Sequence, residues 1–396
     1  MGVPNVKFKY LNGNLGGTNP TQDGVCGLVI QVPVAPSGLG LGVSKALYSL
    51  ADAEALGIIA DYDTTNRVNV YSEIRDFFAN TGGKGELWIM LVSDATSVTD
   101  ICDEQNALAA KLITDSQGRI RVWGVATNRP AGYVADTTNG IDSDIYLAAN
   151  KAQTLRTNFA MNKYIPTRVI LPAREFTGDA SALLDLKQNS NNGVMLSLHG
   201  RQDSSEGMIG FMLGLIASLP VQRNIGRVLN GSLNVAEAYL TDGATRAESI
   251  SAIEDVLHDK GYVFPLIRIG RAGYYYNDDT MATSNKDDYN SLVNGRVIDK
   301  VQRIAYDIYL DRVNDDFGLD LNGKMSAATL KSLQGDVEDA VNTVMTAANE
   351  LSSFRCFVDA NQDTIATGKT FVQLGAQPRG YFKQIEVQLG FRKTQQ

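Results

Sequence analysis

The sequence predicts an α/β fold in which helices cover a largely parallel sheet. Short apolar runs rich in β-branched and aromatic residues are typical of buried strands, and they occupy 86–93, 119–126, 167–173 and 193–200. Segments of helical periodicity lie at 67–80, 99–114 and 142–155; in the first, one face carries Val70, Ile74, Phe77 and Phe78. Strands that alternate with helices favour a parallel sheet.

The segment 36–57 contains Gly38, Gly40 and Gly42 and resembles a phosphate-binding loop at first sight. A dinucleotide loop needs the spacing G-x-G-x-x-G and a helix that opens directly at the glycines, and a P-loop needs four residues between its glycines. Here the spacing is G-x-G-x-G, and 43–49 is predicted as a strand. The next helix is predicted to be capped by Ser49, with Asp52 as the capping-box partner. We therefore predict a connection between two strands.

The segment 204–220 is apolar nearly all round and carries Gly207, Gly210 and Gly214. A helix that is apolar on every side is buried, and small residues let neighbouring elements approach closely. We therefore predict a buried helix here.

The C-terminal third has a different pattern. A long helix is predicted at about 286–313, with an inner face formed by Leu292, Ile298, Val301, Ile304, Ala305, Ile308 and Tyr309, and a second helix at 336–351. Strands are predicted at 353–360, 368–376 and 382–391. The last strand alternates apolar and polar residues, as does 6–11 near the other end. Each of these terminal segments pairs either within its own sheet, the more common arrangement, or with the sheet of another subunit.

Composition excludes several kinds of function. The net charge of −8 argues against nucleic acid or an anionic membrane as the main partner, and no apolar run is long enough to span a bilayer. Cys26, Cys102 and Cys356 fit neither a disulfide framework nor a zinc site and are predicted to be buried thiols. The segment 197–205 contains Ser, His and Asp, but triad members normally come from distant segments, so a polar loop is predicted.

No catalytic, cofactor or metal site is predicted from the residues. A calcium loop through Asp359, Asn361 and Asp363 fails because an EF-hand needs glycine at its sixth position and glutamate at its twelfth, and both are threonine here. His199 and His258 are the only histidines, which leaves little for metal binding or acid–base work. The remaining hypothesis is that the chain acts as part of an assembly.

Several segments, in order, resemble the tail sheath proteins of contractile phage tails and related phage-tail-like injection systems. The C-terminal part of the resemblance is "GRAGYYYNDDTMATSNKDDYNSLVNGRVIDKVQRIAYDIYLDRV" at 270–313 and "FVDANQDTIATGKTFVQLGAQPRGYFKQIEVQLGF" at 357–391. The earlier part is "SLADAEALGI", "IRDFFANTGGKGELWIMLV" and "GFMLGLIASLPVQRNIGRVLNG". Together they cover more than half of the chain, and their order is more specific than any single motif.

The resemblance implies a tail-sheath fold with an α/β core, α+β elements in its C-terminal part and extended β-arms at both ends. It implies an N-terminal arm at 1–20, an α/β region at 21–265, a C-terminal sheath domain at 266–378 and a C-terminal arm at 379–396. Residues 94–190 match the family least, and the resemblance implies a variable, outward-facing insertion there.

The function implied is that of a sheath subunit, not an enzyme, that needs no cofactor. Such subunits stack as hexameric rings around an inner tail tube protein, together with baseplate and tail terminator proteins, and contract to drive the tube through a target cell envelope. The resemblance implies no nucleic acid partner and no direct membrane insertion. It places the subunit in the bacterial cytoplasm during assembly and then in a phage tail or a released phage-tail-like particle.

The resemblance also implies that subunits are linked by strands exchanged from both arms. The residues expected at this exchange are Val6, Phe8 and Tyr10 in the N-terminal arm, Ile385, Val387 and Leu389 in the C-terminal arm, and Phe357, Phe371, Val372 and Leu374 in the receiving hairpin. Two alternatives remain: an α/β enzyme of unknown chemistry, and another tail component such as a tube or baseplate protein.

Overall fold

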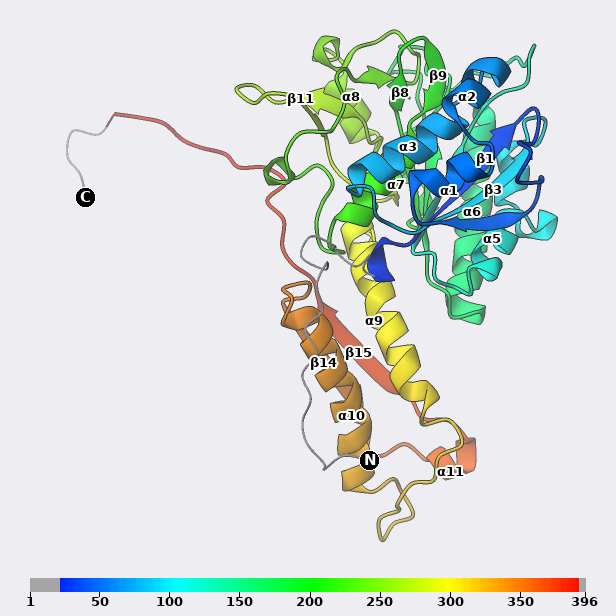
Figure 1. The fold of residues 1–396 in the computed structure, drawn as a ribbon. Coiled ribbons are helices and arrows are strands. Elements are labelled where there is room, and N and C mark those ends of the chain that lie inside the picture. The colour runs from blue at the N-terminus through cyan, green and yellow to red at the C-terminus, as the bar shows by residue number, and fades with distance from the viewer. Residues whose placement is uncertain (1–21, 392–396) are drawn as a thin grey trace, which may run out of the picture. The chain divides into compact units, whose positions relative to one another are not determined.

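The computed structural model describes residues 22–391 and divides the chain into two compact units. The first unit extends to Arg303 and the second begins at Ile304. Helix α9 (Leu292–Leu310) contributes residues to both (Figure 1). Among the described residues, no helix is long and apolar enough to cross a membrane.

The first unit is built on a six-stranded sheet with the order β2-β3-β1-β4-β5-β7. Every neighbouring pair is parallel except β2 with β3. The strands are β1 (Cys26–Val32), β2 (Ser44–Leu47), β3 (Leu87–Ser93), β4 (Val122–Ala126), β5 (Arg168–Pro172) and β7 (Val194–Ser197). The predicted α/β fold with a largely parallel sheet is therefore confirmed. Residues 94–190 supply β4 and β5 and so belong to the core of this sheet; their variability and outward position stay predictions.

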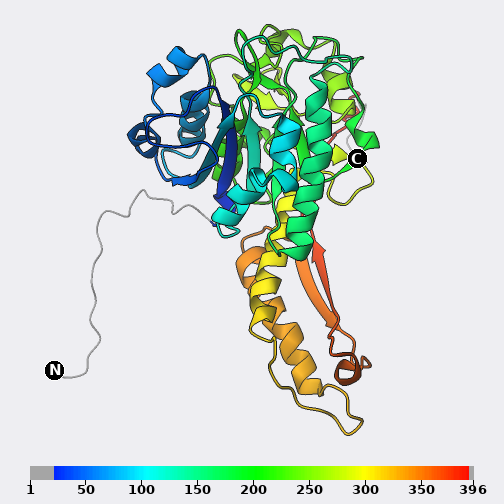
Figure 2. The same cartoon turned by 90° about the vertical axis from the view of Figure 1, so that its right-hand side faces the viewer.

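Helices cover both faces of the sheet (Figure 2). Side chains alternate along each strand, so that Leu28 and Ile30 of β1 join one core while Val29 joins the other. The first core includes α1 (Leu50–Ala55), α3 (Val70–Asn80) and α7 (Ile209–Ser218); α2 (Ala60–Asn66) packs against α3. The second core includes α4 (Val98–Cys102), α5 (Ala109–Asp115) and α6 (Ser143–Asn162).

The prediction of one continuous helix over 99–114 was wrong, because the chain turns between α4 and α5. The Asp103 side chain accepts a hydrogen bond from the Gln105 N–H, which starts a short 3₁₀ turn at Glu104–Asn106. Ala107 then adopts a left-handed conformation with φ of 55°, which no continuous helix accommodates. The capping preference of aspartate overrides the helical periodicity here.

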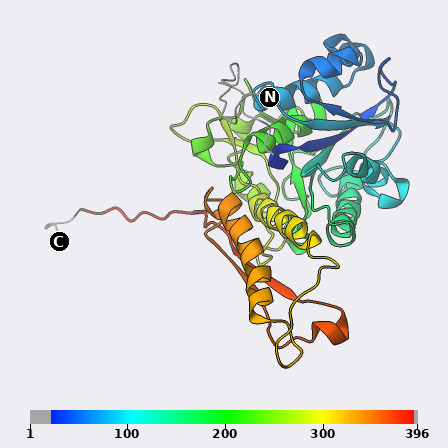
Figure 3. The same cartoon turned by 60° about the horizontal axis from the view of Figure 1, so that its bottom comes forward.

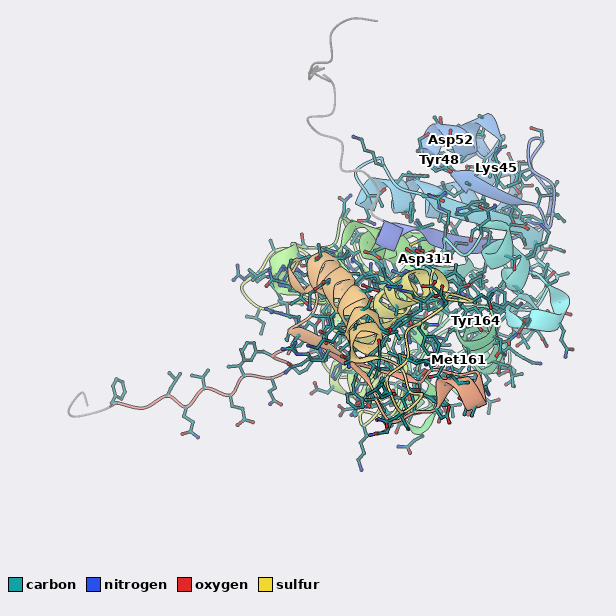
Figure 4. All side chains as sticks on the ribbon, turned by 90° about the horizontal axis from the view of Figure 1, so that it is seen from below. Lys45, Tyr48, Asp52, Met161, Tyr164 and Asp311 are labelled. Atoms are coloured by element: carbon teal, nitrogen blue, oxygen red, sulfur yellow. The ribbon has the colours of Figure 1, made fainter. Side chains whose placement is uncertain are left out.

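The glycine segment connects β1 to β2, as predicted. Ser49 and Asp52 form the predicted capping box at α1, and the Tyr48 and Ser49 N–H groups donate to the Asp52 carboxylate at 2.8 and 2.9 Å. Figure 4 shows Tyr48 and Asp52 near Lys45 of β2. The negative charge of the Asp52 carboxylate at this helix start disfavours a second anion such as a phosphate. Gly38 is required by packing, since a Cβ there would lie 2.7 Å from the Leu56 Cα.

Helix α7 is almost completely buried, as predicted, although it begins at Ile209 because 204–207 form a strand. Its glycines let it lie directly on the backbone of α3. A Cβ at Gly214 would lie 2.5 Å from the Phe77 carbonyl oxygen, and a Cβ at Gly210 would overlap the Glu73 carbonyl oxygen. The Gly210 N–H also donates to the Glu73 carboxylate.

The rest of the first unit consists of short elements. They are β6 (Ser190–Asn191), β8 (His199–Arg201), β9 (Ser204–Gly207), β10 (Tyr239–Leu240), α8 (Glu254–Asp259), β11 (Pro265–Ile267), β12 (Tyr274–Tyr276) and β13 (Ala282–Thr283), with 3₁₀ turns at Gln22–Gly24, Leu186–Gln188, Val228–Asn230 and Ala247–Ser249. The polar loop predicted at 197–205 was wrong: β8 pairs with β9 and β10, and His199 is fully buried. Its Nδ1 lies 2.7 Å from the Tyr276 hydroxyl, so one of the two ring nitrogens has a hydrogen-bond partner and the Nε2 atom has none in the described part of the chain.

The first part of α9 is fixed to β5 by a buried ion pair. The Arg168 guanidinium donates to both carboxylate oxygens of Asp299, at 2.7 and 2.6 Å, and to the Gly295 carbonyl oxygen at 3.1 Å. A side chain at position 295 would meet this guanidinium, since a Cβ there would lie 2.7 Å from Arg168 Cζ. The helix begins at Leu292, later than the predicted 286, because 284–290 form turns closed by Asp287.

The second unit contains the last part of α9, α10 (Ala327–Val341), a π-helical turn (Asn342–Thr346), β14 (Ser353–Val358), α11 (Thr364–Thr367) and β15 (Val372–Gln377). Helix α10 corresponds to the helix predicted at 336–351, and both predicted ends were wrong. Ser326 caps the helix through the Thr329 N–H and starts it nine residues earlier, and the regular helix stops at Val341. Helix α10 lies along the β14–β15 hairpin (Figure 3).

The contact between α3 and α7 predicts the effect of adding one methyl group. Gly214→Ala places a Cβ against the Phe77 backbone, so we expect the first unit to lose about 1–3 kcal/mol of unfolding free energy, measured by chemical denaturation. Gly335→Ala is the matched control, because that helical glycine has open space around it and should be neutral or stabilising by up to about 1 kcal/mol. Equal effects of the two changes would contradict the close contact.

Burial of His199 predicts a pH-dependent stability. Desolvation and, to a smaller extent, the nearby Arg201 charge together lower the pKa of His199 to about 3. The unfolded chain, with a pKa near 6.5, therefore binds a proton that the folded chain does not, and stability falls as the pH drops below about 6.5. We expect about 2 kcal/mol to be lost from this group between pH 7.5 and pH 5. His199→Gln should lack this part of the slope in denaturation measured at both pH values; an unchanged slope contradicts the assignment.

Candidate functional site

The sheet of the second unit has only two strands in the described part of the chain. β14 and β15 pair antiparallel over six residues each, from Ser353 opposite Gln377 to Val358 opposite Val372. Side chains alternate along β14: Phe354, Cys356 and Val358 are buried, and Ser353, Arg355 and Phe357 are exposed. The predicted hairpin is therefore confirmed. Both of its outer edges lack a strand partner among residues 22–391.

The direction of one amide identifies the groups at these edges. The Cys356 N–H donates to the Glu338 carboxylate of α10 at 2.7 Å, so it points away from β15. Because directions alternate along an antiparallel pair, Phe354, Cys356 and Val358 direct their N–H and C=O groups to the outer edge of β14. Their partners Val372, Leu374 and Ala376 do the same at the outer edge of β15.

A groove of about 1030 Å³ lies beside β15, within the second unit. Apolar parts of its wall come from Phe371, Val372 and Leu374 of the hairpin and from Leu333 of α10. Tyr309 closes one side, where its hydroxyl donates to the Leu333 carbonyl oxygen at 3.2 Å. Burial raises the pKa of Tyr309, so this hydroxyl stays protonated at neutral pH. Arg312, Asp315 and Asp316 also line the groove, so it offers a partly apolar and partly charged wall next to a row of backbone hydrogen-bonding groups.

The predicted C-terminal strand is not a strand in the single chain. Residues 379–391 follow β15 as a segment without helix or strand (Figure 1). Its alternate apolar residues Ile385, Val387 and Leu389 are exposed by 72%, 71% and 94%. A strand requires a neighbouring strand for its backbone groups, and no strand in the described part of the chain is paired with this segment. The expectation that it pairs with the sheet of another subunit stays a prediction.

The structure gathers some of the predicted exchange residues and separates others. Phe371, Val372 and Leu374 line the groove together, whereas Phe357 lies on the exposed face of β14 and does not line it. Val6, Phe8 and Tyr10 lie outside the described residues. Sequence reasoning missed Leu333 and Glu338, because their roles depend on how α10 packs on the hairpin rather than on a local pattern.

The other residues considered for chemistry are the three cysteines and the acidic residues of the calcium-loop candidate. Cys26, Cys102 and Cys356 are all buried and free, as predicted. Within residues 22–391, no group of three or more histidine, cysteine, aspartate or glutamate side chains is placed to hold a metal ion. Asp359 accepts a hydrogen bond from the Asn361 N–H in the turn before α11, and Asp363 caps α11 by accepting one from the Ala366 N–H.

The sequence matches both parts of one protein family. The DUF2586 N-terminal domain matches residues 3–280, and the DUF2586 C-terminal domain matches residues 288–396. The chain belongs to the DUF2586 family. No curated protein matches the sequence of this DUF2586 chain.

Solved structures share the fold of this DUF2586 chain over its whole length. A chain from the contracted helical sheath of the anti-feeding prophage (AFP) matches with a TM-score of 0.64 and 14% identity, over 100% of both chains. A chain from the six-fold symmetrised AFP baseplate matches with a TM-score of 0.64 and 14% identity, over 99% of both. The sheath tail protein of Desulfitobacterium hafniense matches with a TM-score of 0.52 and 10% identity, over 94% of this chain and 96% of that one. The predicted tail-sheath fold is therefore confirmed.

The exposure of the C-terminal segment predicts that the subunit folds without it. Deleting residues 384–396 should change the unfolding free energy of the second unit by less than about 0.5 kcal/mol, because every described residue of this segment is exposed. Phe354→Ala is the positive control, because it leaves a cavity at a buried position in β14. It should lower the unfolding free energy by about 3–5 kcal/mol, which verifies that the measurement detects a loss of packing in this unit. Chemical denaturation compares the two. A deletion as costly as Phe354→Ala would show that the segment belongs to its own sheet.

Proposed function

We propose that this DUF2586 chain is the structural subunit of a contractile sheath in a phage tail or a phage-tail-like injection system. The observation that carries the proposal is the match in fold, over the full length, to proteins of the AFP helical sheath and to a sheath tail protein. In the proposed assembly, subunits stack as hexameric rings around an inner tube and contract to drive the tube through a target envelope. The role is structural rather than catalytic and uses no cofactor.

The link between subunits in this proposal is strand exchange. The C-terminal arm (379–396) and the N-terminal arm (1–20) each leave their own subunit and add a strand to the β14–β15 hairpin of a neighbour. The support is the pair of unpartnered edges and the exposed alternating arm. An arm strand beside β15 places Ile385, Val387 and Leu389 over the groove, while Glu386 and Gln388 face solvent, and β15 has the same alternation.

The contacts of an added strand are individually favourable. Each apolar side chain that becomes fully buried contributes about 1.5–3 kcal/mol, and each backbone hydrogen bond adds about 1 kcal/mol. These gains offset the cost of ordering the segment, which is about 1–2 kcal/mol per residue for the backbone. Backbone ladders also need no partner-specific pocket, so an extended connection can keep rings linked while the subunits rotate.

The proposed partners follow from this role. They are further copies of the chain, an inner tail tube protein, and baseplate and tail terminator proteins. We propose no nucleic acid partner and no direct insertion into a membrane. The subunit would assemble in the bacterial cytoplasm and then reside in the virion tail or in a released particle. The predicted domains, with the N-terminal arm at 1–20, the α/β region at 21–265, the sheath domain at 266–378 and the C-terminal arm, are part of the same proposal.

A baseplate component is the second candidate function. The observation that favours it is the equally strong match to a chain from the AFP baseplate. Electron microscopy of the purified protein distinguishes the two functions, because a sheath subunit forms hollow cylinders or stacked rings by itself or around a tube. A protein that joins only a baseplate, and stays monomeric at high concentration with tube protein present, would overturn the proposal of a sheath.

Two substitutions at neighbouring positions test the proposed orientation of the arm. Val387→Asp places a charge in the groove of the neighbour, so we expect the concentration needed for cylinder assembly to rise by at least about tenfold. Gln388→Asp adds the same charge on the solvent side and should leave assembly unchanged. Sedimentation and electron microscopy of both variants provide the measurement. Equal effects of the two variants would contradict an alternating strand.

A further inference from the structure

The two edges of the hairpin differ in one respect that the fold match does not explain. At the edge of β14, the Cys356 N–H is already bonded to the Glu338 carboxylate at 2.7 Å. At the edge of β15, no side chain of the described residues accepts a hydrogen bond from Val372, Leu374 or Ala376. The β15 edge also borders the groove. One edge is therefore occupied at its centre and the other is open.

The position of Glu338 is set by the packing of α10. Val337 and Val341 are fully buried, and α10 contacts β14 along much of its length. Glu338 follows Val337 directly and is half-buried beside the strand. Its hydrogen bond to an amide is charge-assisted, which makes it stronger than one to a neutral acceptor. The carboxylate stands where the carbonyl oxygen of an added strand would accept the same proton.

We propose that Glu338 determines which edge of the hairpin accepts a strand, closing the β14 edge of the free subunit and leaving the β15 edge to the C-terminal arm of a second copy. This inference rests on the proposed function, because it assumes that arms add to the hairpin. Edge strands commonly carry charged groups that discourage unwanted pairing, and Glu338 supplies such a charge from a neighbouring helix. A strand adds at β14 only after this carboxylate moves out into water.

The consequence is an order of assembly. The first arm pairs with β15, where no hydrogen bond has to be broken. An arm at β14 must displace Glu338, and a half-buried carboxylate can return to water without leaving a buried charge unpaired. Free subunits are thereby protected from pairing β14 edge to β14 edge, while the lattice can still use both edges.

Hydrogen exchange on the full-length chain tests the proposal directly. The chain is kept dilute and mixed with a synthetic peptide of residues 379–391, and exchange is resolved at the outward amides of both strands. In the wild type, the peptide should slow exchange at Val372, Leu374 and Ala376 only. In Glu338→Ala it should also slow exchange at Phe354, Cys356 and Val358, and without peptide the Cys356 amide should exchange roughly tenfold faster than in the wild type.

Two control variants separate the role of Glu338 from a general effect of charge. Asp339→Ala removes one negative charge from an exposed position of the same helix and should behave as the wild type. Glu338→Gln keeps an acceptor oxygen at the same place and should fall between the wild type and Glu338→Ala. Thermal unfolding of each variant verifies that the hairpin stays folded.

The outcomes distinguish this inference from the proposal on which it rests. Peptide protection at both edges in the wild type, or at β15 alone in Glu338→Ala, would overturn the role of Glu338 and leave strand addition intact. Absence of protection at either edge in every variant would overturn both the edge choice and strand addition. Neither result bears on whether the purified chain forms cylinders, which microscopy decides separately.

Discussion

The backbone groups at the edges of the β14–β15 hairpin have no strand to pair with in the described chain. A sheet of two strands is marginal in water by itself and is usually stabilised by packing on a helix. Here α10 supplies that packing on one face, through Val337 and Val341. Glu338 of this helix satisfies one group at the β14 edge, the Cys356 N–H, and the other outward groups of the two edges have no strand partner in the described chain. The backbone N–H and C=O groups left at these edges connect three features of the second unit. The groove borders the β15 edge, Glu338 binds an amide of the β14 edge, and the exposed C-terminal segment has the pattern of a strand.

In the first unit, by contrast, the sheet is stabilised by elements of the same unit. Its sheet is covered on both faces, and β2 forms a short antiparallel edge. Glycines place α7 directly on the backbone of α3, and Arg168 holds the start of α9 through Asp299. These contacts leave little freedom for rearrangement, since close-packed interiors deform with difficulty. The first residues of α9 belong to this closely packed unit, and the helix continues into the second unit.

Local patterns predicted most of the core but not the contacts between elements. The strands β3, β4, β5 and β7, the capping box at Ser49 and the buried glycines of α7 followed from residue type and spacing alone. The break at Asp103 was missed because a side-chain cap competes with helical periodicity. The burial of His199 was missed because its partner Tyr276 is 77 positions away along the chain. Glu338 was missed because a carboxylate on a helix carries no sequence signal for the strand amide that it binds.

The C-terminal segment shows why sequence and single-chain structure differ at the candidate site. Ile385, Val387 and Leu389 alternate with polar residues as in a half-buried strand, yet all three are exposed. Alternation of this kind indicates that a sequence is suited to one covered face, but it does not say which molecule covers it. Because the strand pattern remains unsatisfied within the described chain, its partner must come from elsewhere if the pattern has a structural use. Under the proposed function a second copy covers this face, since every copy carries both the alternating segment and the open β15 edge, and the same pairing would then repeat from one copy to the next.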